Sequence, residues 1–197
     1  MRRPTWGQMV TASAALTVAL GCASAPPRLY VNPQADMAFY RKVVVLPFGN
    51  LSQQVLAGER VTRAFITELI IAERFRVVEP ADFYRVLEKI GGEPGGDGSY
   101  DPDKLRQAAA EVGATGVIRG AVTEYQMQRV GQNEFPVVGF DVEMIDASTG
   151  DVVWRTSITR RGGGRVPVFG GSSNRTLGRL TQEACTALVL DLQKRAF

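Results

Sequence analysis

Cys22 is the residue whose position in this sequence most clearly predicts chemistry. It closes the run Ala19-Leu20-Gly21-Cys22, which ends an apolar stretch at residues 9–20 that follows the basic pair Arg2 and Arg3. This layout is typical of a bacterial lipoprotein signal, and the stretch is shorter than the roughly 20 residues that span a bilayer. We therefore expect cleavage before Cys22 and acylation of its thiol and new amine, because several acyl chains together anchor a protein stably.

The lipoprotein signal has one departure, since Ala19 stands where such signals usually carry leucine. An ordinary secretory signal that happens to contain a cysteine is therefore the alternative interpretation. If Cys22 is acylated, the only other cysteine, Cys185, has no disulfide partner within the chain. Cys185 lies on or beside the apolar stripe of an expected C-terminal helix, so we predict a buried structural thiol.

Catalytic residues of the common kinds are scarce. The chain contains no histidine, which excludes Ser-His-Asp and Cys-His dyads, histidine zinc sites and the usual general base near neutral pH. No phosphate-binding or dinucleotide-binding glycine motif supports nucleotide binding. Asp141 and Glu143 alternate along an expected strand and could act as a glycosidase pair, although such pairs more commonly form a solvated or ion-paired surface. We predict a protein that is not an enzyme and uses no metal or cofactor.

The charge balance argues against nucleic acid as a partner. Loss of Arg2 and Arg3 with the signal leaves 21 of the 23 basic residues against 20 acidic ones. Arginines do gather between residues 155 and 165, where they could face lipid headgroups or a polyanion, but a solvated rim explains them as well. Candidate partner residues are the aromatic and basic side chains near the ends of the expected strands, namely Tyr125, Phe135, Phe169, Arg161 and Arg165. Core packing explains another aromatic, Trp154, equally well.

The order of elements predicts one α/β domain. After the signal (residues 1–21), residues 22–41 show no sustained period and are expected to form a flexible tether that carries the lipid. Residues 42–197 are expected to fold as β-α-β-α-α-β-β-β-α, a mixed sheet with flanking helices, in which Ser52 caps the first helix. The predicted strands and helices occupy residues 42–48, 54–73, 75–78, 79–90, 103–112, 115–125, 135–146, 151–160 and a final stretch that begins near residue 173.

Several motifs, in the same order along residues 42–192, resemble those of the curli-secretion lipoprotein CsgG and its relatives. They are the strings VVVLPFGNLS (43–52), ITEL (66–69), RFRVVE (74–79), GATGVIRGAVTEY (113–125) and DASTGDVVW (146–154). The resemblance implies the anticodon-binding-like α/β domain that also occurs in the amino-terminal part of TolB and in LpoB and PelC lipoproteins. Residues 126–134 and 161–173 are too short and too polar or glycine-rich for the membrane-spanning hairpins of the CsgG pore.

The relatives differ in function, so the resemblance leaves two hypotheses. The first is an outer-membrane lipoprotein that faces the periplasm and acts as a scaffold or assembly component of an envelope secretion or biogenesis system. Its partners would be the membrane, an envelope protein or a secreted polymer, and other copies of itself in a ring such as PelC forms. The alternative is an LpoB-like activator of a peptidoglycan synthase, a penicillin-binding protein. A short tether favours the first, because LpoB-like proteins use a long one to reach across the periplasm.

Overall fold

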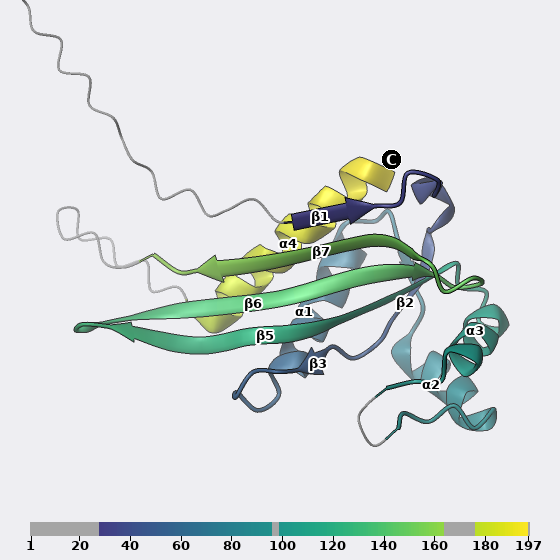
Figure 1. Cartoon of the computed structure of the whole chain (residues 1–197), viewed down its shortest axis with the longest axis horizontal. Coiled ribbons are helices and arrows are strands. Elements are labelled where there is room, and N and C mark those ends of the chain that lie inside the picture. The colour runs from purple at the N-terminus through teal and green to yellow at the C-terminus, as the bar shows by residue number, and fades with distance from the viewer. Residues whose placement is uncertain (1–27, 96–98, 164–175, 197) are drawn as a thin grey trace, which may run out of the picture.

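A mixed sheet with two helices on each face organises the chain (Figure 1). The computed structural model describes residues 28–95, 99–163 and 176–196. The strand order is β1-β7-β6-β5-β2-β4, and β3 pairs with β5 beside β2. The elements are β1 Arg28–Val31, the 3-10 helix η1 Met37–Phe39, β2 Lys42–Val45, β3 Gly49–Asn50, α1 Ala57–Ile71, β4 Arg76–Val77, α2 Pro80–Lys89, α3 Pro102–Glu111, β5 Gly116–Val130, β6 Asn133–Asp146, β7 Val152–Arg161 and α4 Leu177–Ala196.

The central strand β2 is apolar on both faces, as a parallel strand between two helical layers requires. Val43 and Val45 belong to the larger core, which the sheet forms with α1 and α4, whereas Val44 belongs to a smaller core under α2 and α3. In the larger core Phe65 of α1 and Trp154 of β7 are fully buried. The predicted fold class and the order of its nine elements are therefore confirmed.

Local sequence accounts for where α2 and α3 begin. Each helix starts with a proline, whose fixed φ angle suits the first helical position and whose missing N–H costs nothing there. The side chain of Asp101 also caps α3 by accepting hydrogen bonds from the backbone amides of Asp103 and Lys104. None of the helices in the described part of the chain has the length and hydrophobicity that a membrane crossing needs.

The prediction that the flexible tether extends to residue 41 is wrong for residues 28–41. Residues 28–31 form β1, which pairs antiparallel with residues 154–157 of β7, and Leu29 and Val31 pack against the larger core. Tyr40 then donates a hydrogen bond from its hydroxyl to Asp146 at 2.8 Å. Burial, together with this bond, raises the pKa of Tyr40 to about 12, so the hydroxyl stays protonated and continues to donate at neutral pH.

The predicted cap of the first helix is also wrong. The helix begins at Ala57, and its N-cap is Leu56, which has a φ of 64° and makes no capping hydrogen bond through its side chain. The hydroxyl of Ser52 instead accepts a hydrogen bond from the amide of Gln54 within the preceding turn. The later start places Gly58 against the carbonyl oxygen of Phe48, which a Cβ atom would approach to 2.3 Å.

The hairpin of β5 and β6 is longer than predicted. The sequence predicts that the first strand stops at residue 125 and that the second begins at residue 135. They continue instead to a tight turn, where Val130 pairs with Asn133 and Gly131 has a φ of 60°. This polar part of the hairpin is stable because its two strands continue the inner parts of β5 and β6, which pack in the core.

Candidate functional site

Among the residues that the structure describes, no helix lies over about half of one sheet face. Helices α2 and α3 cover the residues of the smaller core, such as Val117, Ile145 and Val152, where β5, β6 and β7 meet that layer. Farther from these helices along each strand, on the same face, most side chains are polar. We call this part of the sheet the open face; its residues are Arg119, Ala121, Asp141, Glu143, Arg155 and Ser157.

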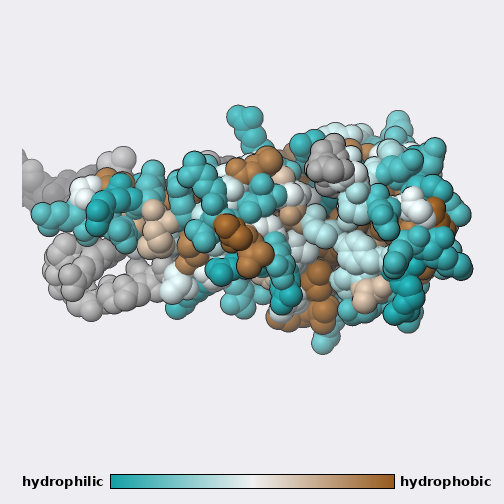
Figure 2. Space-filling view, turned by 90° about the horizontal axis from the view of Figure 1, so that it is seen from below, coloured by the Kyte–Doolittle hydropathy of each residue, from teal (hydrophilic) through white to brown (hydrophobic). Residues whose placement is uncertain are grey.

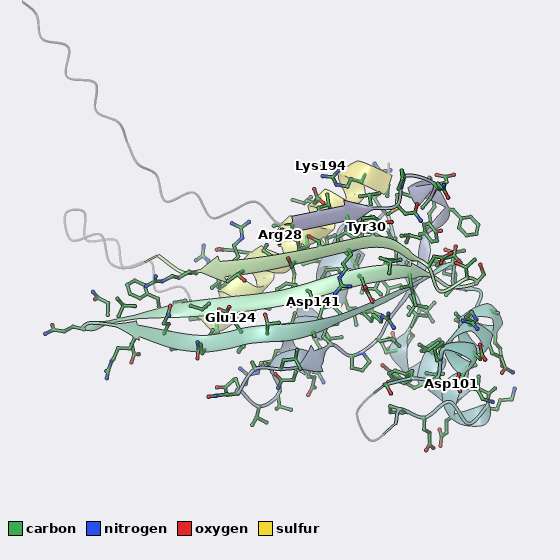
Figure 3. All side chains as sticks on the ribbon, viewed as in Figure 1. Arg28, Tyr30, Asp101, Glu124, Asp141 and Lys194 are labelled. Atoms are coloured by element: carbon green, nitrogen blue, oxygen red, sulfur yellow. The ribbon has the colours of Figure 1, made fainter. Side chains whose placement is uncertain are left out.

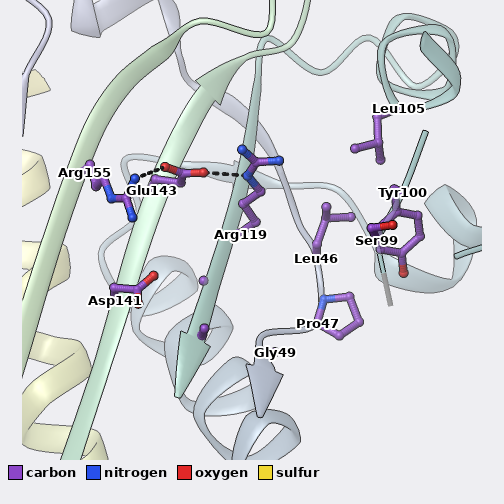
Figure 4. A pocket seen from close by; sticks show the side chains of 12 residues that line it. Leu46, Pro47, Gly49, Ser99, Tyr100, Leu105, Arg119, Asp141, Glu143 and Arg155 are labelled. Carbon is purple, nitrogen blue, oxygen red and sulfur yellow. Dashed lines mark hydrogen bonds and ion pairs between the residues drawn. The ribbon is translucent and has the colours of Figure 1, made fainter. Parts of the chain in front are cut away.

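Glu143 lies between two arginines on the open face (Figure 4). Its neighbour on β5, Arg119, donates from Nε to Oε1 at 2.6 Å, and its neighbour on β7, Arg155, lies 3.4 Å from Oε2 through Nη1. Only 12% of the Glu143 side chain is exposed, against 49% for Arg119 and 59% for Arg155. The carboxylate therefore holds both guanidinium groups in place and leaves N–H groups of each directed to solvent.

Asp141 lies two residues before Glu143 on β6, on the same face of the sheet. Burial raises the pKa of its carboxyl group above the usual value and Glu143 raises it further, while Arg155 opposes the shift. The carboxylate of Asp141 (Figure 3) accepts no hydrogen bond from the residues that the structure describes. Its oxygens are thus hydrogen-bond acceptors that remain available for a bound molecule.

These charged groups form one side of a cavity of about 370 Å³. The opposite side is apolar and comes from the segment after β2 and from the start of α3, including Leu46, Pro47, Tyr100 and Leu105 (Figure 4). Gly120 contributes to the lining without a side chain. The cavity combines donors, acceptors and an apolar wall, which is the composition of a binding site for a polar ligand or a partner side chain.

The predicted partner residues that the structure describes do not form one surface. Phe135 and Arg161 do meet, with the guanidinium carbon 4.4 Å from the ring centre, in a cation–π contact on the hairpin. Phe169, Arg165 and Cys22 lie outside the described residues. The arginines near the end of β7 also separate, because Arg155 and Arg161 project from the face opposite to that of Arg160.

Tyr125 was predicted to contribute to a partner surface, and this is wrong because only 3% of the residue is exposed. A bulge between Val122 and Glu124 adds Thr123 to β5 and reverses the alternation of its side chains. Tyr125 consequently packs in the larger core with Val138, while Glu124 turns to the open side.

Two other residues behave as structural groups. Cys185 is a free, buried cysteine on α4, as predicted, and burial raises the pKa of its thiol, with a further contribution from Glu68. Its low thiolate fraction makes it a poor nucleophile. Trp154 is fully buried in the larger core, and its indole nitrogen has no hydrogen-bond partner among the described residues.

Sequence comparison assigns the family. The family described as the peptidoglycan-synthase activator LpoB matches residues 24–158, which is more than half of the chain. The chain belongs to the LpoB family. No curated protein sequence matches it.

Solved structures support the same fold for this LpoB-family chain. A PelC dodecamer from Paraburkholderia phytofirmans is 22% identical, with a TM-score of 0.57 over 85% of this chain and 96% of that one. Lipoprotein GNA1162 from Neisseria meningitidis is 18% identical, with a TM-score of 0.54 over 78% of this chain and 98% of that one. The resemblance to LpoB and PelC lipoproteins is confirmed.

Proposed function

We propose that this protein is a non-enzymatic scaffold, lipid-anchored at the outer membrane, that binds an envelope partner through the open face. The observation that carries the proposal is the ion-paired Arg119-Glu143-Arg155 row beside a cavity on the part of the sheet that none of the described helices covers. The row keeps two guanidinium groups fixed before a partner arrives, so that binding orders few side chains. Charges held at fixed positions on the sheet also select a partner whose own charges are arranged to match them.

The position of β1 supports a partner close to the membrane. Because β1 begins at Arg28, six residue steps separate Cys22 from the folded domain. An extended chain of that length reaches roughly 20 Å. A domain acylated at Cys22 would therefore remain within about that distance of the membrane surface, where a secretion or assembly complex is within reach.

Activation of a peptidoglycan synthase is the second candidate function. The match of residues 24–158 to the peptidoglycan-synthase activator family favours it. In this case the same open face would contact the synthase, and a partner that extends toward the outer membrane would compensate for the short reach of the domain. The two candidates therefore differ in the identity of the partner and share the binding surface.

The test compares two double variants of the full acylated protein in a strain that lacks the gene. We expect Arg119→Ala with Arg155→Ala to weaken recovery of the partner by tenfold or more, on the order of 1.4 kcal/mol or more. The matched control, Arg63→Ala with Arg85→Ala, removes two exposed arginines that form ion pairs within helices, and it should have no effect. Equal recovery with both double variants would refute binding through the open face.

The partner and a third variant separate the remaining possibilities. Recovery of a penicillin-binding protein supports synthase activation, and recovery of a secretion component supports the scaffold. Asp141→Asn retains the size and an acceptor oxygen of the side chain but removes an acid–base group. A scaffold should lose at most a few-fold in partner recovery, because one acceptor oxygen remains, whereas loss of a catalytic acid or base would cost about 100-fold or more.

A further inference from the structure

The outer part of β5 has a free edge. On the side away from β6, β5 pairs with β2 at residues 116–118 and with β3 at residues 121–122. No strand in the described part of the chain pairs with residues 124–130 on that side, although these residues pair continuously with β6 on the other (Figure 1). One side of the projecting hairpin therefore presents unpaired backbone N–H and C=O groups.

This edge lacks most of the features that prevent strand addition. Natural sheets protect edges with prolines, lysines, short strands or covering segments. Residues 124–130 contain no proline and no lysine, and their only charges are one glutamate and one arginine. Water can hydrogen-bond the free backbone groups of a monomer, but an extended strand would pair with all of them in register.

Exposed apolar side chains lie in the loop beside the base of the free edge and along the edge itself. At its base, the amide of Leu51 donates to the carbonyl of Val122 at 2.8 Å, so the loop before α1 lies next to the point where the edge begins. Figure 2 views the molecule from this side. The exposed fractions are 72% for Leu51, 73% for Val55 and 55% for Leu56 in the loop, and 47% for Met127 and 49% for Val130 along the edge.

The backbone of the loop is also strained. Leu56 has a φ of 64°, a left-handed conformation that favours glycine and disfavours a branched apolar side chain. Strain of this kind persists where the surrounding structure or a function requires it. Here it accompanies a leucine that the folded monomer leaves more than half exposed.

We propose that a second copy of this chain adds its own β5 edge antiparallel to this one, across a two-fold axis at Met127. In that register residue 124 of one copy faces residue 130 of the other, and the two Met127 residues face each other. Val130 of each copy then approaches the base of the other edge, beside the loop that carries Leu51 and Val55. The apolar groups at the two ends are thus complementary to each other, which suits an isologous two-fold contact.

Charge and alternation agree with this register. Directly opposed residues in a sheet must share a face, and residues 124 and 130 project from the same face because they differ by an even number. The edge has no net charge from its one glutamate and one arginine, so two copies do not repel. This inference does not depend on the proposed function, because the free edge and the open face use different residues.

Disulfide trapping tests the register. Directly opposed residues of antiparallel strands have Cα atoms about 4.5–5.5 Å apart, within the range of a disulfide. We expect mild oxidation of full-length, acylated Met127→Cys protein to give a covalent dimer. The buried Cys185 should not react, and Glu88→Cys, at an exposed position on α2, is the matched control. Absence of the dimer, or equal dimer from Glu88→Cys, would overturn the proposal.

A charge variant tests the contact without a covalent bond. Met127→Lys places two ammonium groups opposite each other at the two-fold axis, and we expect at least tenfold weaker dimerisation in sedimentation experiments. Circular dichroism checks that the variant is folded. If the unmodified protein is a monomer at every concentration, or Met127→Cys reacts only with a different protein, the second copy is not the occupant of this edge.

Discussion

Gly58→Ala is expected to destabilise the protein by about 3 kcal/mol, although alanine is the better helix former by about 1 kcal/mol. Gly58 lies in the first turn of α1, and a Cβ atom there would come within 2.3 Å of the Phe48 carbonyl oxygen. That oxygen is backbone and cannot rotate away, so α1 or the segment after β2 must shift. Chemical denaturation of the purified protein measures the free energy of unfolding.

Gly178→Ala is the matched control in α4. Nothing lies within 4 Å of a Cβ atom built at Gly178, so only the helix propensity and the entropy of the unfolded chain change. We expect this variant to be neutral or to gain up to about 1 kcal/mol. If both variants were equally stable, close contact between α1 and the segment after β2 would be contradicted.

Cys22→Ser is expected to abolish attachment to the membrane. Without the thiol no acyl chain can be added, and a protein without the several chains that anchor it stably is soluble or unprocessed. Labelling with a radioactive fatty acid and fractionation of the cells measure this directly. Cys185→Ala should retain both the label and the membrane fraction, because Cys185 is buried in the core. Label that persists in the Cys22→Ser protein would contradict acylation at this residue.

The helices and the central strands could be predicted because burial leaves a clear pattern in the sequence. The three valines of β2 and the prolines that begin α2 and α3 are local signals. β1 carries no such signal, because it is a four-residue edge strand that is defined by pairing with β7, more than a hundred residues away. The outer hairpin was missed because its residues are polar and depend on the anchored parts of the same strands.

The site was harder to predict because it depends on register. Glu143 was recognised as a surface carboxylate, but its contact with Arg119 exists only because the β5–β6 pairing brings residues 24 positions apart side by side. Tyr125 shows that register can also remove a residue from a predicted surface. If the side chains of β5 alternated regularly from Arg119 onward, Tyr125 would lie on the open face. The extra residue at the bulge places it in the core instead.

The most direct test of the central claim is photo-cross-linking from the open face in living cells. A photoreactive amino acid at Ser157, beside the row that contains Arg155, is compared with one at Glu88 on α2. We predict an adduct with an envelope partner from position 157 that position 88 does not give and that Arg119→Ala with Arg155→Ala abolishes. The same adduct from both positions, or an adduct that survives the double variant, would contradict binding through the open face.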